Sequence, residues 1–412
     1  MENKDNILKN SINKSCIKCE ECPNNCKQEI KKEKSATEIV MEKINDPTIY
    51  TVAQTAPSIR TALGEEFELE IGTNVKGKMI TALKKLGFDS VFDTCTGADF
   101  TIVEEANEFL NRITDGGKLP QITSCCPAWV RFAEMNYPEL MQNLSSCKSP
   151  HQMLGAIVKS YFAQKQNIDQ EKIFLVSVMP CLAKRFEINR PEMQVDGIKD
   201  VDEVITTREL AQMIKQKEIN FNQLPDSEFD NPLGEASGAG TIFGTTGGVM
   251  EAALRTAAEM VEGKDLQNIE YEAVRGEQGI KKATVTICDK QINVAVISGL
   301  NNAKQIMEEI KNGTSNYHFI EVMTCPGGCI MGGGQPIPNA ETREKIDVRE
   351  RRANCLYSID EKSTIRKAHE NPNLQQVYKE FFEKIGSDTA HKYLHTRKDN
   401  QKWKFQQKAD IH

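Results

Sequence analysis

The 412-residue sequence lacks any run of about 18 apolar residues, the length that a transmembrane helix requires. Its first ten residues, MENKDNILKN, contain no apolar stretch of signal-peptide length. None of its six histidines belongs to an HExxH pair, which argues against a zinc hydrolase. The formal net charge of −7 argues against nucleic acid as the main partner. We therefore expect a soluble, cytoplasmic protein with neither a membrane nor a nucleic-acid partner.

Cysteine, in contrast, is abundant, with 13 residues. Because the cytoplasm disfavours disulfides, metal ligation accounts for these thiols better. The run CIKCEECPNNC contains Cys16, Cys19, Cys22 and Cys26 in a C-x2-C-x2-C-x3-C pattern. This spacing fits one [4Fe–4S] cubane held by four thiolates, which would admit electrons. A zinc site is the alternative, since zinc also takes four thiolates.

From about residue 50 the sequence alternates between strand and helix patterns. Strands are predicted over 48–57, 90–95, 119–124, 172–180 and 317–324, and helices over 75–88, 98–113, 127–137 and 149–164. A hairpin is expected over 284–300 with its turn near Asp289, and the last fifty residues are expected to be helical. The alternation predicts an α/β fold with mainly parallel sheet flanked by helices.

Three of the predicted strands lead directly into cysteines, namely Cys125-Cys126, Cys181 and Cys325. Ligands of open α/β sheets bind beyond the carboxyl ends of the strands, so these distant thiols are expected to meet in one crevice. The loop CPGGCIMGGGQP adds Cys329, and its glycines let the backbone approach a bulky cofactor. A phosphate-binding loop is a weaker interpretation, because no Lys-Ser/Thr follows.

The stretches TSCCPAW, MPCLAKRFE and EVMTCPGGCIMGGGQP together resemble the cluster-binding signatures of the iron-only, or [FeFe]-, hydrogenases. The resemblance continues through ADFTIVEEANEFL, NLSSCKSPHQ and SGAGTIFGTTGGVMEAALRTA and covers about residues 48–395. It implies a short-form catalytic subunit with one N-terminal cluster motif. Residues 1–45 would form a small iron–sulfur segment, and residues 46–412 a catalytic domain of two lobes with the H-cluster between them.

The resemblance also implies a cofactor site. A [4Fe–4S] cubane would be held by Cys126, Cys181, Cys325 and Cys329. Cys329 would also bridge to a two-iron subsite carrying carbon monoxide, cyanide and a bridging dithiolate, which completes the H-cluster. Lys184 would pair with a cyanide ligand. Further contacts would come from Pro57, Ser58, Met179, Phe243 and Met323.

A proton path is implied in the same way. It would run from Arg112 and Glu108 through Ser145 and Glu105 to Cys125, the spare thiol of the cysteine pair. On their own, residues 105, 108 and 112 share one helical face, which is more typical of a solvated surface stripe.

Several positions depart from the family pattern or have no assigned role. His151 replaces a glutamine that is common in the family near the diiron ligands. It could change the pH response, but we favour a neutral hydrogen-bonding substitute. Cys95 and Cys147 border the site and are expected to be small buried hydrophobes, while Cys288 and Cys355 are expected to be structural.

The expected activity is 2H⁺ + 2e⁻ ⇌ H₂, with a ferredoxin or flavodoxin as the electron carrier and maturation proteins that install the diiron subsite. One alternative is a non-catalytic iron–sulfur assembly or scaffold relative, and another is an H₂ sensor. Cys125, Lys184 and the predicted cofactor contacts Met179 and Met323 argue against a scaffold, which has no need of them. A sensor would typically carry a signalling domain, for which no stretch is long enough. The physiological direction, the oxygen tolerance and the oligomeric state are left open.

Overall fold

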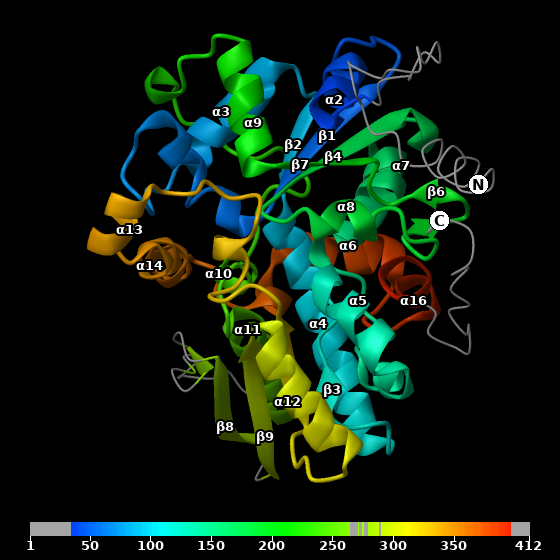
Figure 1. The fold of residues 1–412 in the computed structure, drawn as a ribbon. Coiled ribbons are helices and arrows are strands. Elements are labelled where there is room, and N and C mark those ends of the chain that lie inside the picture. Colours follow the sequence, from blue (N-terminus) through cyan, green and yellow to red (C-terminus); the bar gives the residue numbers. More distant parts are fainter. Residues whose placement is uncertain (1–33, 264–270, 272–273, 276–278, 288–289, 397–412) are drawn as a thin grey trace, which may run out of the picture. The chain divides into compact units, whose positions relative to one another are not determined.

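The computed structural model describes residues 34–263, 271, 274–275, 279–287 and 290–396 (Figure 1). Residues Ala36–Arg397 form one compact unit. The four cysteines of the N-terminal run, Cys288 and the turn of the predicted hairpin lie outside the described residues. The boundary predicted near residue 45 stays a prediction.

The first sheet has four parallel strands in the order β2-β1-β4-β7. These strands are β1 (Tyr50–Thr55), β2 (Ser90–Asp93), β4 (Ile173–Met179) and β7 (Glu203–Thr206). Almost every residue of β1, β2 and β4 is buried, as expected for parallel strands covered on both faces. The helices packed on this sheet include α2 (Ala36–Ile44), α3 (Lys76–Leu86) and α9 (Thr207–Gln216).

The second sheet has the order β3-β10-β9-β8. Its strands are β3 (Gln121–Ile122), β8 (Ile280–Ile287), β9 (Lys290–Ser298) and β10 (Phe319–Met323). The first three in this order are parallel, and β8 pairs antiparallel with β9, as the predicted hairpin requires. The mainly parallel α/β architecture is thus confirmed.

Successive residues of β9 supply two separate cores, because side chains alternate between the faces of a strand. Ala295 and Ile297 pack with α5 (Pro127–Asn136) and α12 (Leu300–Lys311) on one face. Val294 and Val296 pack with α11 (Gly248–Glu262) on the other face. The second sheet is therefore also covered on both sides, whereas a single larger core surrounds the first sheet.

Helix α4 (Thr94–Thr114) connects the first sheet to the second, because β2 precedes it and β3 follows it (Figure 1). The strand predicted over 90–95 ends earlier than expected, at Asp93. The Asp93 carboxylate accepts a hydrogen bond from the backbone N–H of Cys95 and caps the helix, so the chain turns helical at Thr94.

The remaining elements are short or lie near the C-terminus. The other helices are α6 (Pro150–Ile157), α7 (Ala163–Gln166), α8 (Ala183–Glu187), α10 (Gly238–Ile242), α13 (Ala340–Lys345), α14 (Val348–Lys362), α15 (Pro372–Val377) and α16 (Asp388–Leu394). A small ribbon pairs β5 (Gln194–Val195) with β6 (Ile198–Lys199). Within the described part of the chain, no helix combines the length and the apolar character needed to cross a bilayer.

Candidate metal centre

A cavity lies at the carboxyl ends of four parallel strands, with about 850 Å³ of space that protein atoms leave free, including part that is open to solvent. Its walls include residues that directly follow β1 and β4 of the first sheet and β10 of the second, and Cys125, three positions after the end of β3. Both sheets therefore direct their carboxyl ends toward one site, which is the usual ligand position in open α/β sheets.

The four cysteines expected to hold a cubane all line this cavity: Cys126, Cys181, Cys325 and Cys329. Among the described residues, the groups of three or more potential ligand atoms within 4.8 Å of one another do not include these thiols. A tetrahedral zinc ion with Zn–S bonds of about 2.3 Å needs sulfurs about 3.8 Å apart. The spacing is therefore too wide for one zinc ion and leaves room for a larger metal cluster.

The raised pKa values of these thiols also indicate that the cavity holds metal. Burial, together with the neighbouring Cys181 and Cys126 sulfurs, raises the pKa of Cys325 to about 12. Burial and the other cavity thiols also raise the pKa of Cys329 well above its usual range. Four thiolates can share this cavity only if bound cations compensate their charge.

Lys184 supplies one positive charge at the cavity wall. Its Nζ donates to the backbone oxygen of Cys125 at 3.0 Å and to Glu187 Oε2 at 2.7 Å. Burial by itself lowers the pKa of Lys184, but the Glu187 carboxylate and the thiols of Cys125 and Cys329 outweigh it and raise the pKa. Lys184 is therefore a permanent cation beside any anionic group in the cavity.

His151 lies behind Lys184 and shares its carboxylate partner. His151 Nε2 is 2.7 Å from Glu187 Oε2, and Nδ1 is 3.1 Å from Ser177 Oγ. Burial and the Lys184 ammonium lower the pKa of His151 to about 4. The ring is thus neutral near pH 7, with Nε2–H donating to Glu187 and Nδ1 accepting from Ser177, which supports the interpretation as a neutral hydrogen-bonding substitute.

The other predicted cofactor contacts also line the cavity, and most are apolar: Pro57, Ser58, Met179, Phe243 and Met323. The exception is Ser58, whose Oγ is buried without a hydrogen-bond partner among the described residues. A buried polar atom is normally paired, so this hydroxyl suits a polar group held in the cavity.

The glycine-rich loop passes too close to the backbone of Thr246 for a side chain at Gly328. Gly327 and Gly328 have φ values of 88° and 92°, in the left-handed region that favours glycine. A Cβ at Gly328 would lie 2.6 Å from the backbone nitrogen of Thr246. These glycines therefore allow Cys325 and Cys329, four residues apart, to line the same cavity.

Three members of the predicted proton path are joined directly. Arg112 Nη2 donates to Glu108 Oε1 at 2.6 Å, and Ser145 Oγ donates to Glu108 Oε2 at 2.9 Å. Glu105 is buried one turn earlier on α4. Burial raises the pKa of the Cys125 thiol well above its usual range, and the Glu105 carboxylate raises it further.

Some neighbours of these groups are absent from the expectations drawn from sequence. Glu187 is one turn after Lys184 on α8, and this i, i+3 spacing is the signal that could have revealed the pair. Cys126 Sγ lies 3.3 Å from Thr324 Oγ1. His395, far along the chain, approaches the Glu108 region, and no local sequence pattern indicates this contact.

The unassigned cysteines are free thiols in the described part of the chain. Cys95 is fully buried, and its Sγ accepts a hydrogen bond from Arg60. Cys355 is half-buried on α14. Cys147 is buried as well, but it lies beside Glu108 and His395, which are unusual neighbours for a small hydrophobe.

The fold and the cavity define an α/β protein with a thiol-lined site suited to a metal cluster. Residues 49–333 match the family model described as iron only hydrogenase large subunit, C-terminal domain, and residues 346–397 match iron hydrogenase small subunit. The chain therefore belongs to the iron-only hydrogenase family, as the cysteine motifs predicted.

Two curated relatives and one solved structure illustrate the similarity. Iron hydrogenase 1 of Clostridium pasteurianum is 50% identical over 363 residues, which cover 88% of this chain and 63% of the relative. The NADP-reducing hydrogenase subunit HndD of Solidesulfovibrio fructosivorans is 46% identical over 387 residues, covering 92% and 65%. A variant of apo [FeFe]-hydrogenase HydA1 from Chlamydomonas reinhardtii has 39% identity and a TM-score of 0.78, covering 88% and 98%.

This chain thus spans slightly less than two thirds of the length of those two curated relatives. A more distant similarity links it to the cytosolic iron-sulfur assembly component 3 of Bos taurus, with 30% identity over 366 residues, covering 85% of this chain and 74% of the relative. This identity is lower than the 46–50% shared with the two hydrogenases, so the comparisons do not favour the assembly alternative.

Proposed function

We propose that this chain catalyses 2H⁺ + 2e⁻ ⇌ H₂ at an H-cluster held in the thiol-lined cavity. The proposal depends mainly on one observation, which is that four cysteines from three distant segments line the same cavity as Cys125 and Lys184. The identity of 50% to iron hydrogenase 1 supports the same reaction.

The residues present fit such a cofactor in charge, ligand type and space. The cubane would be held by Cys126, Cys181, Cys325 and Cys329, with Cys329 also bridging to the diiron subsite. Lys184 would compensate negative charge, and the Ser58 hydroxyl would donate a hydrogen bond to a cofactor ligand. When bound, the H-cluster supplies the redox-active irons at which protons and electrons combine. One further [4Fe–4S] cluster would be held by Cys16, Cys19, Cys22 and Cys26.

Protons would reach the cavity through Cys125. Because burial and Glu105 raise the pKa of its thiol, Cys125 holds a proton at Sγ near neutral pH. Glu105 would return a proton to this sulfur after each transfer. Ser145, Glu108 and Arg112 would link Glu105 to the surface, since their direct hydrogen bonds already form the outer part of the path.

Electrons would come from a ferredoxin or flavodoxin, and maturation proteins would install the diiron subsite. A cytoplasmic location is consistent with the described cysteines, none of which forms a disulfide. The basic tail over 391–408 could serve as a docking patch for an acidic carrier.

The proposal is tested by anaerobic expression with maturation proteins, followed by infrared spectroscopy and gas chromatography. Infrared bands of iron-bound carbon monoxide and cyanide would exclude a scaffold, and fast H₂ production with a reduced dye would exclude a sensor. Cys125→Ala should lose most of the turnover while keeping its iron and its infrared bands. The matched thiol variant Cys355→Ala should keep its turnover. Normal turnover in Cys125→Ala would refute the relay, and absence of the infrared bands in the matured wild type would refute the H-cluster assignment.

A further inference from the structure

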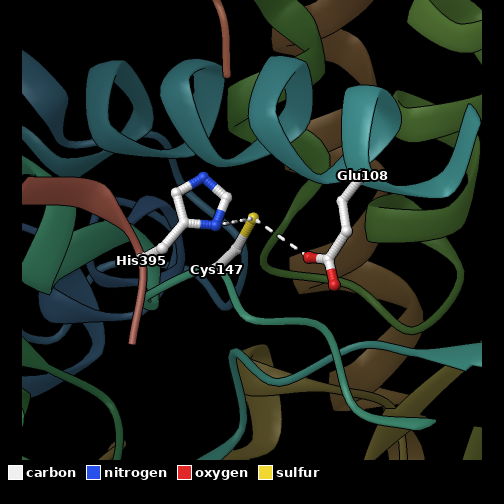
Figure 2. A group of neighbouring side chains, drawn as sticks. All are labelled: Glu108, Cys147 and His395. Carbon is white, nitrogen blue, oxygen red and sulfur yellow. Dashed lines mark hydrogen bonds between the residues drawn. The ribbon is translucent and has the colours of Figure 1, made fainter. Parts of the chain in front are cut away.

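A second group of metal-ligating side chains lies near the proton path and away from the walls of the thiol-lined cavity (Figure 2). Cys147 Sγ is 3.9 Å from Glu108 Oε2 and 3.9 Å from His395 Nδ1. One ligand atom of each residue lies within 4.8 Å of the other two. A thiol, an imidazole and a carboxylate are together the ligand types that zinc prefers.

The main chain holds two of these ligands in place. Cys147 and His395 face each other in an isolated antiparallel bridge. Next to the bridge, the backbone N–H of Lys148 donates to the backbone oxygen of Leu394 at 2.8 Å. Both Cys147 and His395 are buried, so the pair is a fixed part of the interior and not two mobile surface side chains.

A buried carboxylate orients the imidazole from behind. His395 Nε2 lies 3.0 Å from Glu104 Oε2, and Glu104 also accepts hydrogen bonds from the Tyr378 hydroxyl and the Gly386 backbone N–H. In the neutral ring, donation from Nε2–H to Glu104 leaves the Nδ1 lone pair on the side of Cys147. Metal-binding histidines are commonly held by such a carboxylate behind the ring.

Ser146 Oγ lies beside two of the ligand atoms, 2.8 Å from His395 Nδ1 and 3.1 Å from Glu108 Oε2. Glu108 Oε2 already accepts from Ser145 Oγ and from the Ser146 backbone N–H, both at 2.9 Å. The Ser146 hydroxyl can therefore donate to His395 Nδ1, and a cation between Nδ1, Oε2 and Sγ would replace this hydrogen bond.

The distances and the access fit a single ion. Tetrahedral zinc with Zn–S of about 2.3 Å and Zn–N of about 2.05 Å requires sulfur and nitrogen about 3.6 Å apart, so the 3.9 Å between Cys147 Sγ and His395 Nδ1 needs only a small adjustment. Glu108 and His395 also line a solvent-open pocket together with His391. An ion could enter through this pocket and take its fourth ligand from water.

We propose that Glu108, Cys147 and His395 bind a thiophilic divalent cation such as Zn²⁺, and that its binding blocks proton transfer at Glu108. Binding replaces the thiol proton, in the balance Cys–SH + Zn²⁺ → Cys–S–Zn⁺ + H⁺. The cation binds Glu108 Oε2, the atom that accepts a hydrogen bond from Ser145 Oγ in the metal-free chain. It thereby interrupts the proposed proton path between the surface and Glu105. The inhibition rests on the proposed function, whereas the binding does not.

Zinc X-ray absorption on the holoenzyme with one equivalent of Zn²⁺ tests the binding, because the signal of zinc is separate from that of iron. The wild type should show one Zn–S distance of about 2.3 Å and Zn–N/O distances of about 2.0–2.1 Å. Cys147→Ser should lose the sulfur contribution, and the matched thiol variant Cys355→Ser should keep it. A wild-type spectrum without sulfur, or one unchanged in Cys147→Ser, would overturn the site.

H₂ production at increasing Zn²⁺ tests the inhibition, with each variant compared with its own rate in the presence of a chelator. The wild type should be inhibited reversibly. Glu104→Gln keeps all three ligands but loses the carboxylate behind the imidazole, so it should need about 10–100 times more Zn²⁺ for half-inhibition. The control His369→Asn alters a different acidic and histidine group, with Glu259 and Glu370, and should keep wild-type sensitivity.

Equal sensitivity of the wild type and Glu104→Gln, or loss of sensitivity in His369→Asn, would overturn the assignment of inhibition to Glu108. A matured chain that produces no H₂ would instead refute the proposed function, and the absorption spectra would still report whether the site binds zinc.

Discussion

Replacing His151 with glutamine should make the fold less sensitive to acid. His151 is buried against Glu187 and Lys184, and its pKa is lowered from the ordinary 6.5 to about 4. The folded protein therefore keeps the ring neutral at a pH where the unfolded chain has already bound a proton. Stability is lost as the pH falls through 6.5, and the loss is complete below about pH 4.

The size of the effect follows from the two pKa values. Integrated from pH 8 to pH 5, a change from 6.5 in the unfolded chain to about 4 in the fold removes about 2 kcal/mol from the free energy of unfolding. The Glu187 carboxylate contributes stability that is lost mainly below about pH 4.5. Its pKa is lowered from 4.5 to about 2 by Lys184 and His151, which outweigh the effect of its burial. Over the same pH range Glu187 removes much less than about 1 kcal/mol, so His151 dominates.

The assay is urea denaturation of the reduced, metal-free chain at pH 8 and pH 5, followed by the fluorescence of buried Trp129. The wild type should lose about 2 kcal/mol more than His151→Gln between the two pH values. The control His318→Gln removes a half-buried histidine of another part of the fold and should retain the wild-type loss. If His151→Gln and the wild type lost the same free energy, the neutral state of His151 in the fold would be refuted.

Two further predictions concern the loop and the buried charges. Gly328→Ala should lower the iron bound per chain after maturation, because φ is 92° and a backbone nitrogen lies 2.6 Å from the new Cβ, while Gly333→Ala, with no atom within 4 Å of its Cβ, should leave the iron content unchanged. Arg255→Met should reduce the free energy of unfolding in urea by about 3 kcal/mol, since it removes the buried guanidinium shared by the Glu251 and Asp360 carboxylates, which keep Arg275 and Arg366. The exposed ion-pair variant Lys345→Ala should change it by less than about 0.5 kcal/mol, and an equal effect of the two variants would contradict the role of burial.

The sequence patterns predict the sheets well because burial on both faces leaves a direct trace in the residues. The apolar run of β4 and the apolar stretch of β9 give their strands without reference to distant contacts, whereas β8, which is partly exposed, begins four residues before the predicted hairpin. The end of β2 was placed too late, since the capping role of Asp93 depends on the hydrogen bond that its side chain makes in the fold.

The site was predictable only in part, because much of it depends on pairings between distant segments. Cysteines that follow parallel strands could be brought together by a topological rule. In contrast, the contact between Cys147 and His395 comes from a backbone bridge across 248 positions, and no spacing rule connects them. Resemblance to a family indicates Lys184, and the i, i+3 spacing on α8 is the sequence signal for its buried partner Glu187.

Helix α4 shows how neighbouring residues of one element take up different chemical tasks. Glu104 and Glu105 are adjacent, and successive side chains of an α-helix point about 100° apart. Glu104 thus faces His395, while Glu105 affects the thiol of Cys125. Glu108, one turn further, meets Ser145 and lies between these two environments. An ion bound at Glu108 would therefore act on proton delivery without contact with the walls of the thiol-lined cavity.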